Sequence, residues 1–199
     1  MRAIIITGGT INDYTYYKTF IKPEDTIICA DSGYDHAVKM GINIDILIGD
    51  LDSISSVPEN VPIIRYPVDK DQTDTELALN YVKNKGFTEI LLIGAIGTRL
   101  DHSIANIFLL TQFNNTIIID ETHKIMIGSN LYLHETEGTI VSLLPLTHCS
   151  GIYTENLKYP LINASMAVGY SRGISNVTTE EKATIKVKEG IMLVIIVRE

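Results

Sequence analysis

The sequence predicts an α/β protein in which a doubly wound, mostly parallel sheet domain is followed by a small all-β domain, a sandwich or a barrel. Up to about residue 120, short runs of isoleucine and leucine alternate with segments of helical spacing. Strands that are buried on both faces form such continuous apolar runs, and their alternation with helices is typical of βαβ units. After residue 120, strand-like runs separated by Gly, Asn and Pro follow one another without a convincing helix. We therefore predict one domain at residues 1–122 and a second at residues 123–199.

The strands are predicted from the apolar runs. In the first domain these runs lie at residues 3–7, 26–30, 45–49, 89–94 and 116–120. In the second domain they lie at residues 124–128, 131–135, 138–146, 183–190 and 191–197. The first set lacks polar alternation and fits a sheet covered on both faces.

Three helices are predicted between the strands of the first domain. The segment 32–41 ends on Gly41, a residue type that favours the left-handed turn at a helix end. The segment 73–86 begins with Thr73 and Glu76, which have the spacing of a capping box. The segment 100–113 carries apolar residues at helical spacing.

Composition and charge exclude several classes of protein. The chain has 199 residues, 45% hydrophobic and 20% charged, which is the composition of a globular protein. Its net charge of -8 argues against nucleic-acid or anionic-membrane partners, since both select basic surfaces. The two cysteines form no zinc or disulfide pattern, and no apolar run is long enough for a signal peptide or a membrane span. We expect a cytoplasmic protein.

Acidic residues follow several of the predicted strands. Asp31, Asp50 and Asp120 each end an apolar run, and ligands bind at the carboxyl ends of the strands in an open α/β sheet. Asp50 and Asp52 are two residues apart, so an extended segment would direct both to one side. Such a pair suits Mg²⁺, although Asp is also common in plain strand-end turns.

A second acidic cluster precedes the helix at residues 73–86. Asp69, Asp71 and Asp74 lie within six residues of one another. Acids at a helix N-terminus complement the helix dipole, and capping alone would account for Asp69. Asp71 and Asp74 are candidates to extend a metal site, because three acids exceed what one cap requires.

Two glycine-rich turns are candidates for phosphate contact. In GAIGTRLDHS, Gly94 and Gly97 let the backbone approach a ligand, and Arg99 is a bidentate donor to phosphate. The alternative is an ordinary strand-to-helix turn with Thr98 as the cap. The turn ITGGTIND lacks the dinucleotide pattern, and the chain has no P-loop motif. The residues alone thus favour an α/β enzyme that acts on nucleotide phosphates with an acid-held Mg²⁺, its substrate left open.

Five stretches, in order, resemble the thiamine pyrophosphokinase family: ADSGYDHA, GDLDSI, DKDQTDTELAL, GAIGTRLDHSIANI and GISNV. Together they cover most of the chain, and the ordered set is specific although each motif alone is weak. The resemblance implies that ATP and thiamine react to give AMP and thiamine diphosphate. It also implies a homodimer with thiamine near the subunit interface.

The resemblance implies roles for named residues. The Mg²⁺ ligands would be Asp50, Asp52 and Asp71, and the catalytic set adds Asp74, Arg99 and Asp101. Contacts with ATP and its phosphates are implied for Asp31, Ser32, Gly33, Gln72, Thr73, Gly94, Arg99 and His102. Thiamine contacts are implied for Gln72, Tyr159, Ser175 and Asn176. Tyr159 stands where the family often has Trp, and this chain has no Trp.

Two other functions remain open from the sequence. A pyrophosphokinase for another alcohol, such as a hydroxymethylpterin, would keep the acidic residues and change the pocket around Tyr159 and Ser175. A nucleotide-sensing module without turnover would bind ATP but would not need acids placed for transfer. The joint presence of Asp50, Asp52, Asp71, Asp74, Arg99 and Asp101 argues against the sensor.

Overall fold

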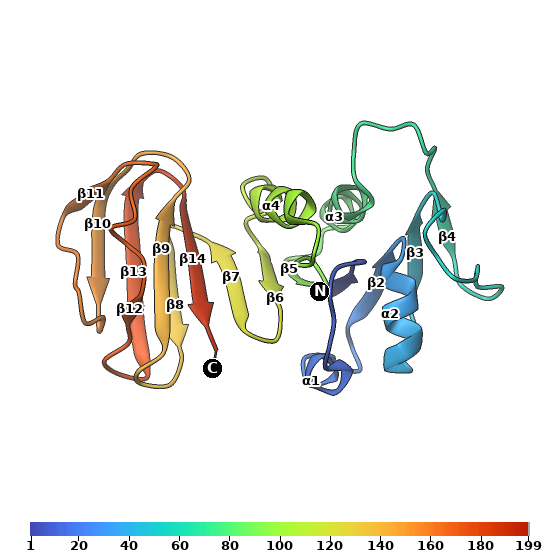
Figure 1. The fold of residues 1–199 in the computed structure, drawn as a ribbon, viewed down its shortest axis with the longest axis horizontal. Coiled ribbons are helices and arrows are strands. Elements are labelled where there is room, and N and C mark those ends of the chain that lie inside the picture. Colours follow the sequence, from blue (N-terminus) through green and yellow to red (C-terminus); the bar gives the residue numbers. More distant parts are fainter. Residues whose placement is uncertain (199) are drawn as a thin grey trace. The chain divides into compact units, whose positions relative to one another are not determined.

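The computed structural model describes residues 1–198, which form two compact units (Figure 1). The first unit comprises Met1–Glu121, and the second begins at Thr122. The predicted fold class is confirmed: a parallel sheet flanked by helices occupies the first unit, and the second is built from strands.

The first unit is organised around six parallel strands. Their order in the sheet is β6-β5-β1-β2-β3-β4. The strand bounds are β1 (Arg2–Ile6), β2 (Thr26–Ala30), β3 (Ile46–Gly49), β4 (Ile63–Arg65), β5 (Glu89–Ile93) and β6 (Thr116–Ile119). The central strands are nearly all aliphatic and fully buried, as expected for strands with helices on both faces.

Four helices cover this sheet. They are α1 (Tyr14–Lys18), α2 (Gly33–Met40), α3 (Asp74–Asn84) and α4 (Leu100–Leu109). The short α1 packs beside α2 on one face, and α3 lies beside α4 on the other (Figure 1). Gly41 is left-handed at the end of α2, and the Thr73 hydroxyl accepts a hydrogen bond from the Glu76 N–H, which is one half of the predicted capping box. The Glu76 carboxylate accepts from the Gln72 side chain.

The second unit contains two sets of antiparallel strands, the layers of a sandwich (Figure 1). One set pairs in the order β12-β9-β14-β7 and the other in the order β11-β10-β13-β8. The bounds are β7 (His123–Ile127), β8 (Asn130–His134), β9 (Ile140–Pro145), β10 (Cys149–Glu155), β11 (Ala164–Met166), β12 (Asn176–Val177), β13 (Lys182–Glu189) and β14 (Met192–Val197). Along β13, Ala183, Ile185 and Val187 are buried and their neighbours are more exposed, so one face of the strand points into the core.

The part of the chain that the structure describes has no helix with the length and apolar character needed to cross a membrane.

Candidate active site

The sheet of the first unit has a point where its topology reverses. β1 and β5 are neighbours, but the chain passes from β1 toward β2 and from β5 toward β6, in opposite directions along the sheet. Ligands bind at such a switch point, outside the carboxyl ends of the strands. A cavity of about 540 Å³ opens there, lined by the segments that follow β1, β2, β3, β4 and β5 and by the first turns of α3 and α4.

Two glycine turns meet on one side of the cavity. The Gly9 N–H donates to the Gly94 carbonyl at 2.7 Å, and the Thr10 N–H donates to the Ile96 carbonyl at 2.9 Å. A Cβ added at Gly9 would lie 2.1 Å from the Gly94 oxygen. Gly94 itself has φ +69°, and its Cβ would lie 2.4 Å from the Thr7 oxygen. Both positions therefore require glycine, because the two turns pack against each other too closely for a side chain. Both glycines also line the cavity.

His36 on α2 fixes the first of these turns. Its Nε2 lies 2.8 Å from the Gly9 carbonyl oxygen, which only accepts, so this nitrogen carries the proton. Its Nδ1 lies 3.0 Å from the Tyr14 hydroxyl. Burial lowers the pKa of His36, against the hydrogen bond to Gly9, while Lys39 lowers it further and Asp35 opposes the shift. The shift favours the neutral imidazole at pH 7.

Three carboxylates converge elsewhere in the lining of the cavity. Asp31, Asp50 and Asp52 each offer an oxygen, and these oxygens lie within 4.8 Å of one another. Asp31 is buried, and its Oδ1 has no hydrogen-bond partner among the described residues. Three like charges this close repel unless a cation lies between them, and carboxylate oxygens are the donors that Mg²⁺ prefers. The residues therefore fit a magnesium ion.

The loop that carries this cluster is tied to α2. The Ser55 hydroxyl and N–H both donate to the Asp35 carboxylate, at 2.7 Å and 3.2 Å. Within the loop, the Asp52 N–H donates to Asp50 Oδ1 at 3.2 Å, and the Ser53 hydroxyl donates to Asp52 Oδ1 at 2.6 Å. The two predicted acids thus share one tight turn, and α2 supports both the glycine turn and the acidic turn.

Lys70 lies against these acids, and the sequence analysis did not predict a role for it. Its Nζ lies 2.5 Å from Asp50 Oδ2 and 3.2 Å from Asp74 Oδ1. The hydrogen bond from Lys70 lowers the pKa of Asp50. Burial raises the pKa of Asp74, against the effect of Lys70 and together with the charges of Asp50 and Asp31. Burial acts to lower the pKa of Lys70, but its two acidic partners outweigh it and the pKa is raised.

Arg99 stands at the entrance to α4. Its guanidinium donates to both oxygens of Asp101, at 3.0 Å and 2.6 Å, and both side chains are largely exposed. This pairing lowers the pKa of Asp101. Behind Arg99, the Ser103 hydroxyl accepts a hydrogen bond from the Gly97 N–H at 3.0 Å and so holds the second glycine turn on the helix.

Most of the predicted residues of the first unit come together at the cavity. Asp71 does not: it is exposed and lies outside the lining, and Asp31 completes the carboxylate cluster. Asp101 and Gly33 also lie outside the lining, and Gly33 is buried where a Cβ would meet the Ile6 oxygen at 2.0 Å. Asp120, at the end of β6, is buried and away from the cavity as well. The predicted residues that do line it are Asp31, Ser32, Asp50, Asp52, Gln72, Thr73, Asp74, Gly94, Arg99 and His102.

The three predicted residues of the second unit also lie near one another. The buried Asn176 side chain accepts from the Tyr159 N–H at 2.9 Å and donates to the Tyr159 carbonyl at 2.8 Å. Asn176 therefore holds the Tyr159 backbone much as a neighbouring strand would. Tyr159 as a residue is 60% exposed, and Lys158 Nζ lies 5.6 Å from the centroid of its ring. Ser175 has φ +57°, and its N–H donates to the Ser142 hydroxyl.

Comparisons with known proteins agree with this arrangement. Residues 17–119 match the family model "Thiamin pyrophosphokinase, catalytic domain", and residues 122–192 match "Thiamin pyrophosphokinase, vitamin B1 binding domain". The thiamine pyrophosphokinase of Bacillus subtilis is 29% identical over 96% of both chains. Thiamine pyrophosphokinase 3 of rice, Oryza sativa subsp. japonica, is 30% identical over 80% of this chain and 73% of its own.

Solved structures agree as well. The crystal structure of the Bacillus subtilis thiamine pyrophosphokinase superposes with a TM-score of 0.89 at 25% identity and covers all of both chains. The structure of the Geobacillus thermodenitrificans protein, at 24% identity and a TM-score of 0.86, has the same fold. Because the two family models together span nearly the whole chain, this protein belongs to the thiamin pyrophosphokinase family.

Proposed function

We propose that this protein transfers the pyrophosphoryl group of ATP to the hydroxyl of thiamine, with Mg²⁺ as the metal ion. The observation that carries the proposal is the cavity at the switch point. There, the carboxylates of Asp31, Asp50 and Asp52 line the same cavity as two closely packed glycine turns. Membership of the thiamin pyrophosphokinase family supports the choice of substrates.

In the proposed reaction, the thiamine hydroxyl oxygen bonds to the β-phosphorus of ATP. The bond between that phosphorus and the oxygen bridging to the α-phosphate breaks, so AMP leaves and the hydroxyl proton is lost. The products are thiamine diphosphate and AMP. Transfer of this kind depends mainly on alignment and on neutralising phosphate charge.

The acidic side of the cavity is assigned to metal binding. Asp31, Asp50 and Asp52 would hold Mg²⁺. The predicted ligand Asp71 lies next to Lys70 in the sequence, in the segment between β4 and α3. When bound, Mg²⁺ supplies positive charge against the phosphate oxygens of ATP. The unpartnered Oδ1 of Asp31 supports the site, since a buried carboxylate oxygen without a partner is costly.

The protein's own residues would align the nucleotide. The turns at Gly9 and Gly94 line the cavity and would contact the nucleotide, and Gln72 and Thr73 line it as well. Arg99, oriented by Asp101, would bind phosphate as a bidentate donor. His102, Ser32, Gly33 and Asp74 keep the phosphate-binding or catalytic roles that the family resemblance implies.

The second unit is assigned to thiamine binding and dimer formation. The exposed ring of Tyr159 offers a stacking platform for a flat cation, and Asn176 supports its backbone. We propose a homodimer with thiamine near the subunit interface, acting in the cytoplasm, where the two buried free cysteines stay reduced.

A product assay tests the proposal. Purified protein, thiamine, ATP and Mg²⁺ are incubated, and the products are separated by anion-exchange chromatography. Equal amounts of AMP and thiamine diphosphate are expected. ADP with thiamine monophosphate would overturn the transfer chemistry, and AMP formation with another alcohol but none with thiamine would overturn the substrate.

A further inference from the structure

Lys70 has a position in the cavity that the proposed roles do not explain. Its ammonium lies between Asp50 and Asp74, and its side chain is 14% exposed. Asp50 is the acid that also contributes to the carboxylate cluster with Asp31 and Asp52. One carboxylate therefore belongs to two neighbouring groups: the cluster that fits a metal ion, and the ion pair with Lys70.

The double role of Asp50 matters because the cavity contains more acidic than basic side chains. Four acids line it, and among the described lining residues the lysine and arginine side chains are those of Lys70 and Arg99. Arg99 already pairs with Asp101, on the side of α4. Lys70 is thus the positively charged side chain that lies among the acids of the cavity. An anionic polyphosphate that enters there meets excess negative charge unless cations offset it.

Resting on the proposed function, we propose that Lys70 is an exchangeable second cation of the site. In the structure it pairs with Asp50 and Asp74. When a divalent cation takes Asp50, the ammonium moves to the oxygens of the polyphosphate that is transferred. The site then needs one divalent cation and one lysine to offset the substrate's charge.

The chemistry of lysine suits such a movement. Its ammonium is a compact charge on a flexible four-carbon stem, and it makes no fixed fork with a carboxylate as arginine does. Lys70 lies in the segment between β4 and α3, outside regular secondary structure, while Asp74 is the first residue of α3. The ammonium can therefore change partners without disturbing an element of the fold.

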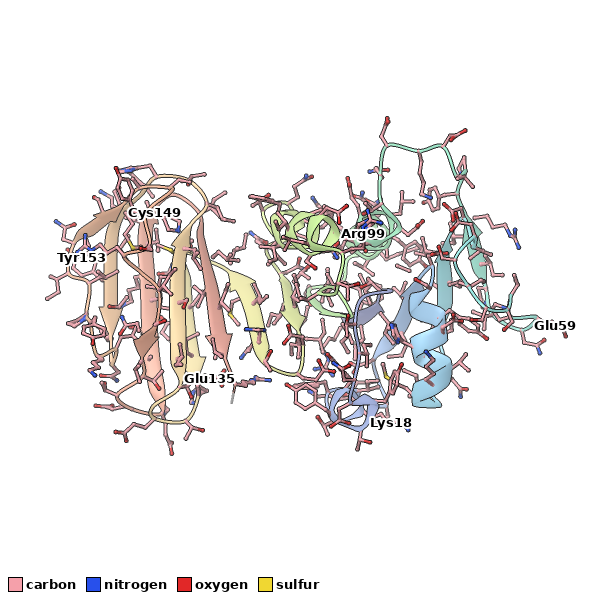
Figure 2. All side chains as sticks on the ribbon, viewed as in Figure 1. Lys18, Glu59, Arg99, Glu135, Cys149 and Tyr153 are labelled. Carbon is pink, nitrogen blue, oxygen red and sulfur yellow. The ribbon has the colours of Figure 1, made fainter. Side chains whose placement is uncertain are left out.

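Divalent-cation binding without nucleotide provides the first test. Mn²⁺ takes the same oxygen ligands as Mg²⁺, and its free ion is measured by EPR. In Lys70→Met no ammonium competes for Asp50, so we expect Mn²⁺ to bind on the order of tenfold more tightly than to the wild type. Lys18→Met is the matched control, because Lys18 is exposed on α1 and outside the cavity (Figure 2).

A purely structural role for Lys70 predicts the opposite sign. If the lysine only holds Asp50 and Asp74 in place, its loss lets the acids separate, and Mn²⁺ binding weakens or stays unchanged. Either result would overturn the exchange. If neither the wild type nor Lys70→Met bound Mn²⁺, the metal assignment under the proposed function would fail, and the exchange with it.

Nucleotide binding supplies the second test. The probe is α,β-methylene ATP at saturating Mg²⁺. Its methylene group replaces the oxygen between the α- and β-phosphates, so the bond that breaks in the proposed reaction cannot be cleaved. We expect Lys70→Met to weaken its binding by about tenfold, the loss of one charge-assisted contact, and Lys70→Gln, which stays polar but carries no charge, to weaken it to a similar extent. Unchanged affinity in Lys70→Met would place the ammonium away from the polyphosphate and overturn that half of the proposal. Lys70→Gln also covers the case in which the methionine variant fails to fold.

Discussion

At the scale of single residues, the site is dominated by like charges held close together. Asp31, Asp50 and Asp52 gather their oxygens within 4.8 Å, and Asp74 joins them through Lys70. Asp31 is buried, so water solvates its carboxylate only in part, and its Oδ1 has no hydrogen-bond partner among the described residues. Such a cluster is stable only with added positive charge. Removing one carboxylate should therefore affect function far more than folding.

Asp52→Asn tests this at the most exposed member of the cluster. The amide keeps the shape of the side chain and loses the charge, so we expect turnover to fall by about 10³-fold or more while the melting temperature changes little. Asp69→Asn in the following acidic segment is the control, because Asp69 is exposed and outside the cavity. Steady-state rates and thermal melts of both variants decide the matter. Near-wild-type turnover in Asp52→Asn would show that the metal assignment is wrong.

Tyr159 allows a second test at this scale. Its ring is mostly exposed and its backbone is held by Asn176, so Tyr159→Ala removes the platform and leaves the local fold intact. We expect the KM for thiamine to rise by about tenfold and the KM for ATP to change little, with Tyr159→Phe close to the wild type. Initial rates with each substrate varied in turn give both constants. An equal rise in the two would argue against a thiamine platform.

At the scale of elements, the sequence predicted the strands and helices that are long enough to carry a clear apolar or periodic pattern. The apolar strands of the first unit and the capped helices α2 and α3 carry continuous signals, and they lie close to the predicted ranges. The sequence analysis missed α1 and β4, which have five and three residues, too few for a periodic pattern. It also missed β10, where CSGIYTE contains a glycine and few apolar residues.

The candidate site likewise has parts that the sequence could predict and parts that it could not. Acids at strand ends were predictable, because the carboxyl ends of parallel strands meet at one edge of a sheet. The partners of Lys70 were not, since they depend on the conformation of the irregular segment between β4 and α3. The support that α2 gives through Asp35 and His36 was equally hidden, because both partners lie far away in sequence.

The contact of α2 with β1 yields a prediction at the element scale. A Cβ at Gly33 would lie 2.0 Å from the Ile6 backbone oxygen, so Gly33→Ala forces the helix away from the strand. We expect a loss of about 1–3 kcal/mol in the free energy of unfolding, measured with urea. Gly41→Ala at the other end of α2 meets no atom within 4 Å and bears only the strain of its φ of +65°. Its loss should be about 1 kcal/mol, and a loss as large as that of Gly33→Ala would contradict the steric account.

His36 connects α2 with the glycine turn and makes stability depend on pH. Burial lowers the pKa of His36 in the folded protein below its unfolded value of about 6.5. The unfolded chain therefore takes up the proton first, and stability is lost as pH falls from about 6.5 through the folded pKa. We expect His36→Gln to lose less stability than the wild type between pH 7.5 and 5.5 in urea unfolding. Carboxylates with lowered pKa, such as Asp50, act only below this window, and Asp74, whose pKa is raised, titrates in both proteins. The difference between His36→Gln and the wild type therefore reports His36.

At the scale of the whole molecule, the net charge of -8 acts differently on the two proposed substrates. Thiamine is a cation and is attracted by the field of the protein. The magnesium complex of ATP is an anion and is repelled, apart from the local effect of Lys70 and Arg99. Salt screens both long-range effects, with a Debye length of about 30 Å at 0.01 M and about 8 Å at 0.15 M ionic strength.

Ionic strength should therefore shift the two Michaelis constants in opposite directions. Between about 10 and 150 mM KCl we expect the KM for thiamine to rise and the KM for the magnesium complex of ATP to fall, each by about twofold to fivefold. Free Mg²⁺ is held at saturation, so that its own competition with K⁺ does not contribute. Initial rates with one substrate varied and the other saturating give both constants at each salt concentration. If both constants rise together, contacts with Lys70 and Arg99 outweigh the field of the whole protein, and Lys70→Met should then restore the opposite trends.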